Sequence, residues 1–378
     1  MKYCRKCVQP DTRPGVLFDE EGVCFACRYE ERKAEVDWEK REEEILKIAQ
    51  QARERRGDTP YDCVVGVSGG KDSTFQAYYA RDRLGLRPLL VNALPDKLTD
   101  VGRHNLENMV SAGFDIIHMR PNPKVVKKLV KHFFYDRCNP VKPNEYPICV
   151  AAPLIADKFN IPLILQGENA ALTLGAAATG QSLDDDAFSM VNLDTLAGGD
   201  LSEFVGDGVG MDDLFLYKFP DVDSMKRKGI RAVFIQYYAK EWSQVRNAEF
   251  SVARGLWGRT TENLYDIGRY RRYTALDCDM VIMNQMLKYL KFGFGFATDE
   301  ACYDIREGRL TRNEAIWLVK EYDGMCAERY IQSFCEYIAI SVEEFWRVVD
   351  GHVNKKLFRK EGGRWVPKFE PGVDFDEE

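Results

Sequence analysis

Residues 64–73 read VVGVSGGKDS, an apolar run followed by a glycine-rich loop. The apolar part is typical of a short buried strand, and the residues after the loop can begin a helix. Gly69 and Gly70 let the backbone approach an anion closely, while N–H groups of the loop and the first helical turn point toward it. The stretch therefore predicts a phosphate-binding loop between a strand and a helix.

Side chains of the same loop add specific chemistry. Two serine hydroxyls are further donors, Lys71 supplies a positive charge, and Asp72 can orient the loop or contact Mg²⁺. We therefore expect Lys71 and Asp72 to act in catalysis. The loop residues expected to bind a nucleotide are Ser68, Gly69, Gly70, Lys71, Asp72 and Ser73.

The loop does not match the Walker A motif G-x-x-x-x-G-K-[ST], because counting from Gly66 places Lys71 where the second glycine should be. A Walker loop usually serves cleavage at the γ-phosphate. The pattern SGGxDS instead resembles the PP-loop of the ATP pyrophosphatases. This resemblance implies that ATP is bound, that pyrophosphate is the leaving group, and that a substrate oxygen is adenylated at the α-phosphorus.

Strand-like and helix-like segments alternate around the loop, which predicts an α/β fold with a parallel sheet covered on both faces. Asn92 ends the second strand, where adenosine would lie along the carboxyl edge of the sheet. Gly167 and Glu168 follow the fourth strand, where the loop of PP-loop enzymes commonly faces the phosphates. Glu168 is a candidate Mg²⁺ ligand, with an ordinary turn or helix-start residue as the alternative. The expected strands span residues 63–67, 88–94, 115–119 and 162–165, and the expected helices residues 73–84, 102–112, 124–134 and 147–159.

Four of the eleven cysteines lie in the first 27 residues, as two CxxC pairs separated by 16 residues. This spacing is typical of a four-cysteine zinc site, and a closed shell of thiolates is structural rather than catalytic. Iron or a redox pair is the alternative. The expected Zn²⁺ ligands are Cys4, Cys7, Cys24 and Cys27.

The composition is ordinary for a soluble protein, with 45% hydrophobic and 30% charged residues. We find no apolar run near the length of a membrane span and no signal-like start, so we expect a cytoplasmic protein without membrane contact. The net charge of −7 argues mildly against a large nucleic-acid surface.

The expected divisions are a zinc module (1–36), a linker helix (37–60), a PP-loop ATP-binding domain (61–174), a Gly/Asp-rich insertion or lid (175–229) and a mainly helical substrate or partner region (230–378).

Three stretches together indicate a more specific relationship. They are YCRKCVQPDTRPGVLFDEEGVCFACRYEE at residues 3–31, YLKFGFGFATDEACYDIREGRLTRNEAIWLVKEYDG at 289–324 and ISVEEFW at 340–346. With SGGKDS they resemble the N-acetyl sugar amidotransferases of bacterial surface-polysaccharide (O-antigen) synthesis. The C-terminal block is the more specific part, because other enzymes share the cysteine and PP-loop motifs.

The resemblance implies that an N-acetyl group on a nucleotide-linked sugar becomes an acetamidino group, with release of AMP and pyrophosphate. It also implies that ammonia comes from partner proteins similar to the glutaminase and cyclase subunits of imidazole glycerol phosphate synthase. Lys291 and Arg306 in the C-terminal block are candidates for binding the anionic sugar nucleotide, with a solvated basic face as the alternative. Residues 175–215 are a candidate for sealing the adenylate from water or for meeting the ammonia donor, with a solvated loop insertion as the alternative.

Two other functions remain open. Some tRNA thiolation enzymes also join a cysteine zinc site to an SGGKDS loop. They typically need a catalytic cysteine pair or an iron–sulfur site, and Cys138 and Cys149 do not form a CxxC. A nucleotide-binding adaptor without activity would not need Lys71 and Asp72 beside a metal-binding Glu168. The residues leave open which sugar is used and which acetamido group reacts.

Overall fold

A parallel β-sheet forms the centre of the computed structural model, which describes residues 1–376 apart from residues 177, 179 and 194. The order of its five strands is β3-β2-β1-β4-β5, and each neighbouring pair is parallel. The predicted α/β class with a parallel sheet is therefore confirmed. The strands are β1 (Cys63–Gly66), β2 (Pro88–Ala93), β3 (Asp115–Met119), β4 (Leu163–Gln166) and β5 (Arg231–Phe234).

Alternate residues of the strands face two separate apolar clusters, as the twofold period of a strand requires. Val64 belongs to the cluster of helices α5 (Pro123–Arg137) and α6 (Lys142–Phe159). Its neighbour Val65 belongs to the cluster on the opposite face. That face is covered by α2 (Trp38–Arg55), α3 (Lys71–Tyr78) and α4 (Asp100–Ser111). The strands are continuously apolar because both faces are buried.

The strand order reverses at β1, which lies between β2 and β4. The chain leaves β1 toward α3 on one face of the sheet, whereas after β4 it runs to the Gly/Asp-rich segment, which packs with α6 on the other face. The loops after β1 and β4 therefore separate at the carboxyl edge and leave a crevice, the usual ligand position in open parallel sheets. The SGGKDS residues follow β1, and Glu168 lies on the loop after β4.

The Gly/Asp-rich segment is a packed part of the core. Its described residues form short 3-10 turns and one helix, α8 (Val222–Arg227), against α6. The Tyr146 hydroxyl of α6 anchors it by donating to the carbonyl oxygens of Leu196 (2.5 Å) and Asp200 (2.7 Å). Buried apolar side chains of this segment are Phe188, Met190, Leu196, Phe204, Leu214, Tyr217 and Met225. The segment thus covers one face of the sheet.

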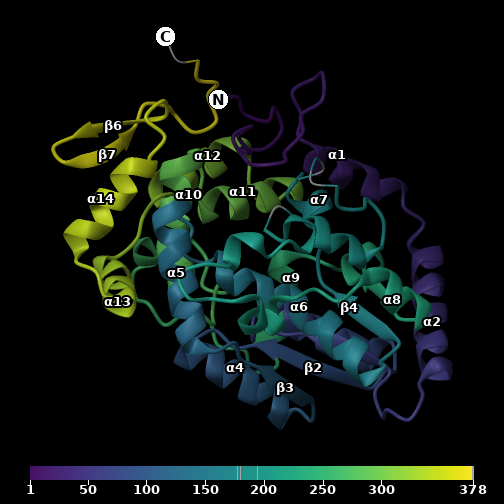
Figure 1. Cartoon of the computed structure of the whole chain (residues 1–378). Coiled ribbons are helices and arrows are strands. Elements are labelled where there is room, and N and C mark those ends of the chain that lie inside the picture. Colours follow the sequence, from purple (N-terminus) through teal and green to yellow (C-terminus); the bar gives the residue numbers. More distant parts are fainter. Residues whose placement is uncertain (177, 179, 194, 377–378) are drawn as a thin grey trace.

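The C-terminal region is helical and ends in a small hairpin (Figure 1). Its helices are packed around Met283, Phe334 and Phe345, which join Phe134 of α5 in one apolar cluster. Figure 1 places the N-terminal cysteine-bearing segment and α1 (Phe25–Arg32) beside this region. The elements are α9 (Gln244–Val252), α10 (Met280–Phe292), α11 (Phe296–Arg306), α12 (Arg312–Tyr322), α13 (Glu328–Ile338), α14 (Val342–His352), β6 (Phe358–Glu361) and β7 (Arg364–Pro367), with the short α7 (Ala170–Thr173) following β4. Among the described helices, none has the length and apolar character needed to span a membrane.

Candidate active site

The loop after β1 has the backbone geometry of an anion-binding turn. Gly69 has a φ of +76°, and a Cβ added there would lie 3.1 Å from the Gly102 carbonyl oxygen of α4. Gly70 is the N-cap of α3, and no described side chain caps this helix start. The N–H groups of the first turn of α3 are therefore available to an anion, which the helix dipole also attracts.

Helix α9 holds the start of α3 in place. The Asn247 side chain donates to Asp72 Oδ1 at 2.8 Å, and the Ser251 hydroxyl donates to the carbonyl oxygen of Lys71 at 2.8 Å. Lys71 is only 5% exposed, and its Nζ lies 2.5 Å from Asp72 Oδ2. The ammonium and carboxylate are thus fixed at the phosphate loop. Ser73 stabilises the turn itself, because its hydroxyl donates to the carbonyl oxygen of Gly70 at 3.1 Å.

Glu168 faces this loop from the end of β4. Its Oε2 accepts hydrogen bonds from the Tyr303 hydroxyl at 3.2 Å and from Gln244 Nε2 at 3.3 Å. Burial and the charge of Asp72 together raise the pKa of Glu168 to about 7, against the lowering effect of Lys71. Two carboxylates on facing loops are suited to share a divalent cation, and Mg²⁺ prefers such oxygen ligands.

Gly167 has a steric reason to be glycine, since an added Cβ would lie 1.9 Å from Gln76 Nε2 of α3. The β4 loop therefore approaches α3 closely, and a side chain at this position would push the two loops apart. This contact keeps Glu168 near the phosphate loop.

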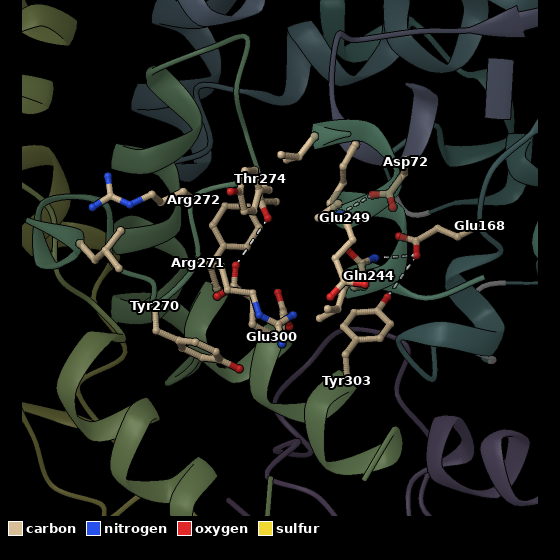
Figure 2. A pocket seen from close by; sticks show the side chains of 18 of the residues that line it. Asp72, Glu168, Gln244, Glu249, Tyr270, Arg271, Arg272, Thr274, Glu300 and Tyr303 are labelled. Carbon is tan, nitrogen blue, oxygen red and sulfur yellow. Dashed lines mark hydrogen bonds and ion pairs between the residues drawn. The ribbon is translucent and has the colours of Figure 1, made fainter. Parts of the chain in front are cut away.

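A cavity of about 610 Å³ opens directly in front of Lys71, Asp72 and Glu168. Helix α9, the segment around residues 264–274 and α11 complete its walls. Figure 2 shows Asp72 and Glu168 on one side of the cavity and Arg271, Thr274 and Glu300 on the other. The volume is that of a typical small-molecule site. The cavity thus joins the loop predicted to bind nucleotide to the C-terminal region.

The wall opposite the phosphate loop carries aromatic and charged groups. Arg271 pairs with the buried Asp304, which also accepts from the Tyr270 hydroxyl at 2.7 Å. The Arg272 guanidinium donates to the Thr261 carbonyl oxygen and points away from the cavity in Figure 2. Arg271 is therefore the arginine of this wall placed to meet an anionic substrate.

Helix α11 presents two different faces. Phe296, Glu300 and Tyr303 line the cavity, at the spacing of one helical face. Ala301 and Cys302 lie in the apolar cluster of the N-terminal cysteine module. Asp323 fixes the start of α11 by accepting from the N–H groups of Gly295 (2.8 Å) and Thr298 (3.2 Å). Packing of α11 on the cysteine module therefore fixes the position of the side chains that α11 contributes to the cavity.

The four cysteines of the N-terminal module converge, and all their sulfur atoms lie within 4.8 Å of one another. The Sγ distances are 3.9 Å for Cys4 to Cys27 and 3.7 Å for Cys7 to Cys24. Thiolates about 2.3 Å from a tetrahedral zinc ion are about 3.8 Å apart, so the arrangement fits this metal. Backbone N–H groups of Lys6 and Gln9 point at the sulfurs, each at 3.4 Å, as befits thiolate ligands.

Lys71, Asp72 and Glu168 are the predicted site residues that line the cavity. Asn92, Lys291 and Arg306 lie outside both this lining and the two loops that carry those residues. Asn92 is buried under the carboxyl edge, where its Nδ2 donates to the Val67 carbonyl oxygen at 2.6 Å. Lys291 donates to the carbonyl oxygens of Arg137 (3.1 Å) and Cys138 (3.0 Å), so its ammonium stabilises the C-terminus of α5 instead of facing a substrate. Arg306 lies behind Tyr303, with its guanidinium 4.8 Å from that ring. Neither Lys291 nor Arg306 lines the cavity.

Most residues of the cavity wall opposite the SGGKDS loop, called the far wall below, were not predicted from the sequence. The run YRRYT at residues 270–274 offered a signal, since two arginines between aromatic residues are unusual. Glu300 lies inside the C-terminal block quoted above, where the prediction named two cations and no acidic residue. Gln244 and Glu249 of α9 offered no sequence signal that we recognise.

Comparisons with known proteins bear on the far wall alone. No curated protein matches the chain. Residues 267–369 match a family model described as "LPS biosynthesis protein WbpG-like, C-terminal domain". The matched residues contribute Tyr270 to Thr274 and the cavity face of α11, whereas the phosphate loop and Glu168 lie before them. Over this segment the chain is similar to proteins of lipopolysaccharide biosynthesis, which supports a role in that process.

Proposed function

We propose that this chain is an ATP-dependent amidotransferase that replaces the carbonyl oxygen of an N-acetyl group on a nucleotide-linked sugar with nitrogen. The observation that carries the proposal is the SGGKDS loop at the reversal of the strand order, opening into the 610 Å³ cavity. The similarity of the other wall to a lipopolysaccharide biosynthesis domain supports a sugar of a surface polysaccharide as the substrate.

An amide carbon is a poor electrophile because its oxygen cannot leave. In the proposed reaction the amide oxygen attacks the α-phosphorus of ATP, and the bond from that phosphorus to the pyrophosphate oxygen breaks. The oxygen then departs with AMP when ammonia adds at the carbon. The product is an acetamidino group, with one AMP and one pyrophosphate released for each sugar converted. No protein nucleophile is required, so catalysis rests on positioning and on charge stabilisation.

Each side chain of the near wall has a role in this scheme. N–H groups of Gly70 and the first turn of α3 would hold the pyrophosphate, and Lys71 would balance its charge. Asp72 and Glu168 supply the oxygen ligands that would hold Mg²⁺, which neutralises charge on the phosphates when bound. Zinc at the four cysteines would be structural, because four thiolates close its coordination shell.

Ammonia is proposed to come from separate glutaminase and cyclase-like proteins similar to subunits of imidazole glycerol phosphate synthase. ATP and nucleotide-linked sugars are cytoplasmic metabolites, so we place the reaction in the cytoplasm. Thiolation of tRNA is the less favoured alternative. Cys138 lies at the end of α5 in the cluster of α10 and α13, and Cys149 lies on α6. Both are thus placed in helix packing and not on the cavity lining described above.

The test is exchange of radiolabelled pyrophosphate into ATP by the purified chain. We expect exchange that depends on Mg²⁺ and on a nucleotide-linked N-acetyl sugar, and amidino product when ammonium salt is added. Glutamine alone should not replace ammonium unless the partner proteins are present. Exchange that depends on bulk tRNA instead, or ADP as the nucleotide product, would refute the proposal.

A further inference from the structure

A buried glutamate on the far wall of the cavity has a free carboxylate oxygen. Glu300 of α11 is 8% exposed, and its Oε1 accepts a long hydrogen bond of 3.5 Å from the Thr274 hydroxyl. Within the described part of the chain, its Oε2 has no hydrogen-bond partner. A buried carboxylate oxygen without a partner is costly in free energy, so a donor is expected there when the site is filled.

The neighbouring acids differ from Glu300 because they already have partners. Asp72 and Glu168 accept the hydrogen bonds described above, and Asp299 pairs with Lys288 at 3.0 Å. Glu249 is exposed at the cavity rim. Glu300 is therefore the buried carboxylate of this cavity wall placed to accept a proton or a hydrogen bond from a ligand.

Burial and the charges around Glu300 together bring its pKa close to neutral pH. Arg269 is fully buried, with its guanidinium 3.8 Å from the Phe296 ring centroid. Burial raises the pKa of Glu300 to about 7, while Arg269, Arg271 and Lys71 lower it and Asp304 raises it. A carboxyl group that titrates near neutral pH can both take up and release a proton during turnover.

The position of Glu300 fits the second half of the proposed reaction. Because the loop beside Lys71 is assigned to the pyrophosphate, the adjoining α-phosphate of the adenylate lies on that side of the cavity, and the acetamido carbon lies between the loop and α11. Figure 2 places Glu300 on the wall opposite Asp72 and Glu168. A nucleophile that approaches the carbon from the side away from the phosphate therefore arrives next to Glu300.

We propose that Glu300 is the catalytic base that receives ammonia in this cavity, an inference that rests on the proposed function. The nitrogen lone pair forms a C–N bond to the protonated imidate, which gives a tetrahedral adduct with an –NH₃⁺ group. Glu300 takes one proton from this group. The C–O bond to AMP then breaks, its electron pair leaves with the phosphate, and the amidinium product forms. The proton on Glu300 passes to solvent.

Glu300→Gln separates the two halves of the reaction. With ATP, a nucleotide-linked N-acetyl sugar and ammonium chloride, the variant should keep pyrophosphate exchange within about threefold of the wild-type rate. Formation of amidine should fall by about 100-fold or more, the usual contribution of a general base. AMP should still accumulate, because water attacks the adenylate and regenerates the acetamide.

Three further measurements guard against a merely structural effect. Glu300→Asp keeps the charge that faces Arg269 and should restore part of the amidine formation. Hydroxylamine is largely unprotonated at neutral pH and loses a proton readily after addition. Used in place of ammonia, it should reduce the difference in the rate of product formation between Glu300→Gln and wild type. Glu262→Gln removes an exposed carboxylate of the same region and should behave as wild type.

The outcomes are distinct. Amidine formation by Glu300→Gln at the wild-type rate would overturn the assignment, and so would a parallel loss of exchange and amidine in both Glu300 variants. Absence of sugar-dependent exchange in the wild-type chain would refute the proposed function, and the role of Glu300 with it.

Discussion

Two adjacent glycines of the phosphate loop are expected to respond differently to alanine. At Gly69, with φ at +76°, an alanine costs about 1–2 kcal/mol in backbone strain. Relief of its 3.1 Å contact with the Gly102 carbonyl oxygen adds about 1 kcal/mol. Gly70 has φ −92° and ψ 168°, which alanine adopts freely, and its nearest contact would be Ser68 Oγ at 3.2 Å. Gly70→Ala should therefore cost less than about 1 kcal/mol of stability.

The effect on activity should have the opposite order, with Gly70→Ala lowering the rate more than Gly69→Ala. A methyl group at Gly70 occupies space assigned to the pyrophosphate, and displacement of the phosphates by about 1 Å lowers the rate by about 100-fold. With an unfolding entropy of about 2.1 cal/mol/K per residue, the cost at Gly69 lowers the Tm by about 3 °C in this chain. Calorimetry and pyrophosphate exchange measure the two effects, with Gly57→Ala as control because a Cβ there meets no atom within 4 Å. Equal destabilisation by both variants, or normal exchange by Gly70→Ala, would refute the reasoning.

Three other variants test the remaining parts of the site. Cys24→Ser should remove the zinc, about one ion per chain, and lower the Tm and the activity together; elemental analysis of a fully active protein without metal would contradict this. Amidine formation per unit of free ammonia should rise as pH rises through about 7, because only the carboxylate form of Glu300 accepts a proton, and Glu300→Gln should flatten this profile. Arg271→Ala should raise the KM for the sugar more than that for ATP, whereas Lys291→Ala should lower stability by about 1 kcal/mol and leave both KM values unchanged in steady-state kinetics.

Sequence alone predicted the local features of the fold. Four of the five sheet strands and the helices between them could be located, because buried strands are short apolar runs and helices show their own spacing of apolar residues. The predicted strand at residues 115–119 has the same bounds as β3. The two CxxC pairs also placed their four sulfur atoms together, since that spacing leaves few other arrangements.

Features set by long-range packing could not be predicted in the same way. The bond from Asn247 to Asp72 joins residues 175 positions apart, and no local pattern announces it. The Gly/Asp-rich segment reads as a loop because its buried side chains lie on short 3-10 turns without a regular period. Lys291 stands in a block with a distinctive sequence, but that block also contains residues that only hold helices together.

The double-sided character of α11 has a consequence for how this chain can be divided. The matched segment begins at residue 267, yet Ala301 and Cys302 inside it pack on the cysteine module at the other end of the chain. A fragment cut at that boundary would expose this apolar face and lose the ion pair of Arg13 with Asp299. A chimera that exchanges residues 267–369 between related chains should therefore remain folded only when residues 1–36 are exchanged with them. Substitutions in the two segments are expected to be correlated among related chains, although 230 residues separate the segments in the sequence.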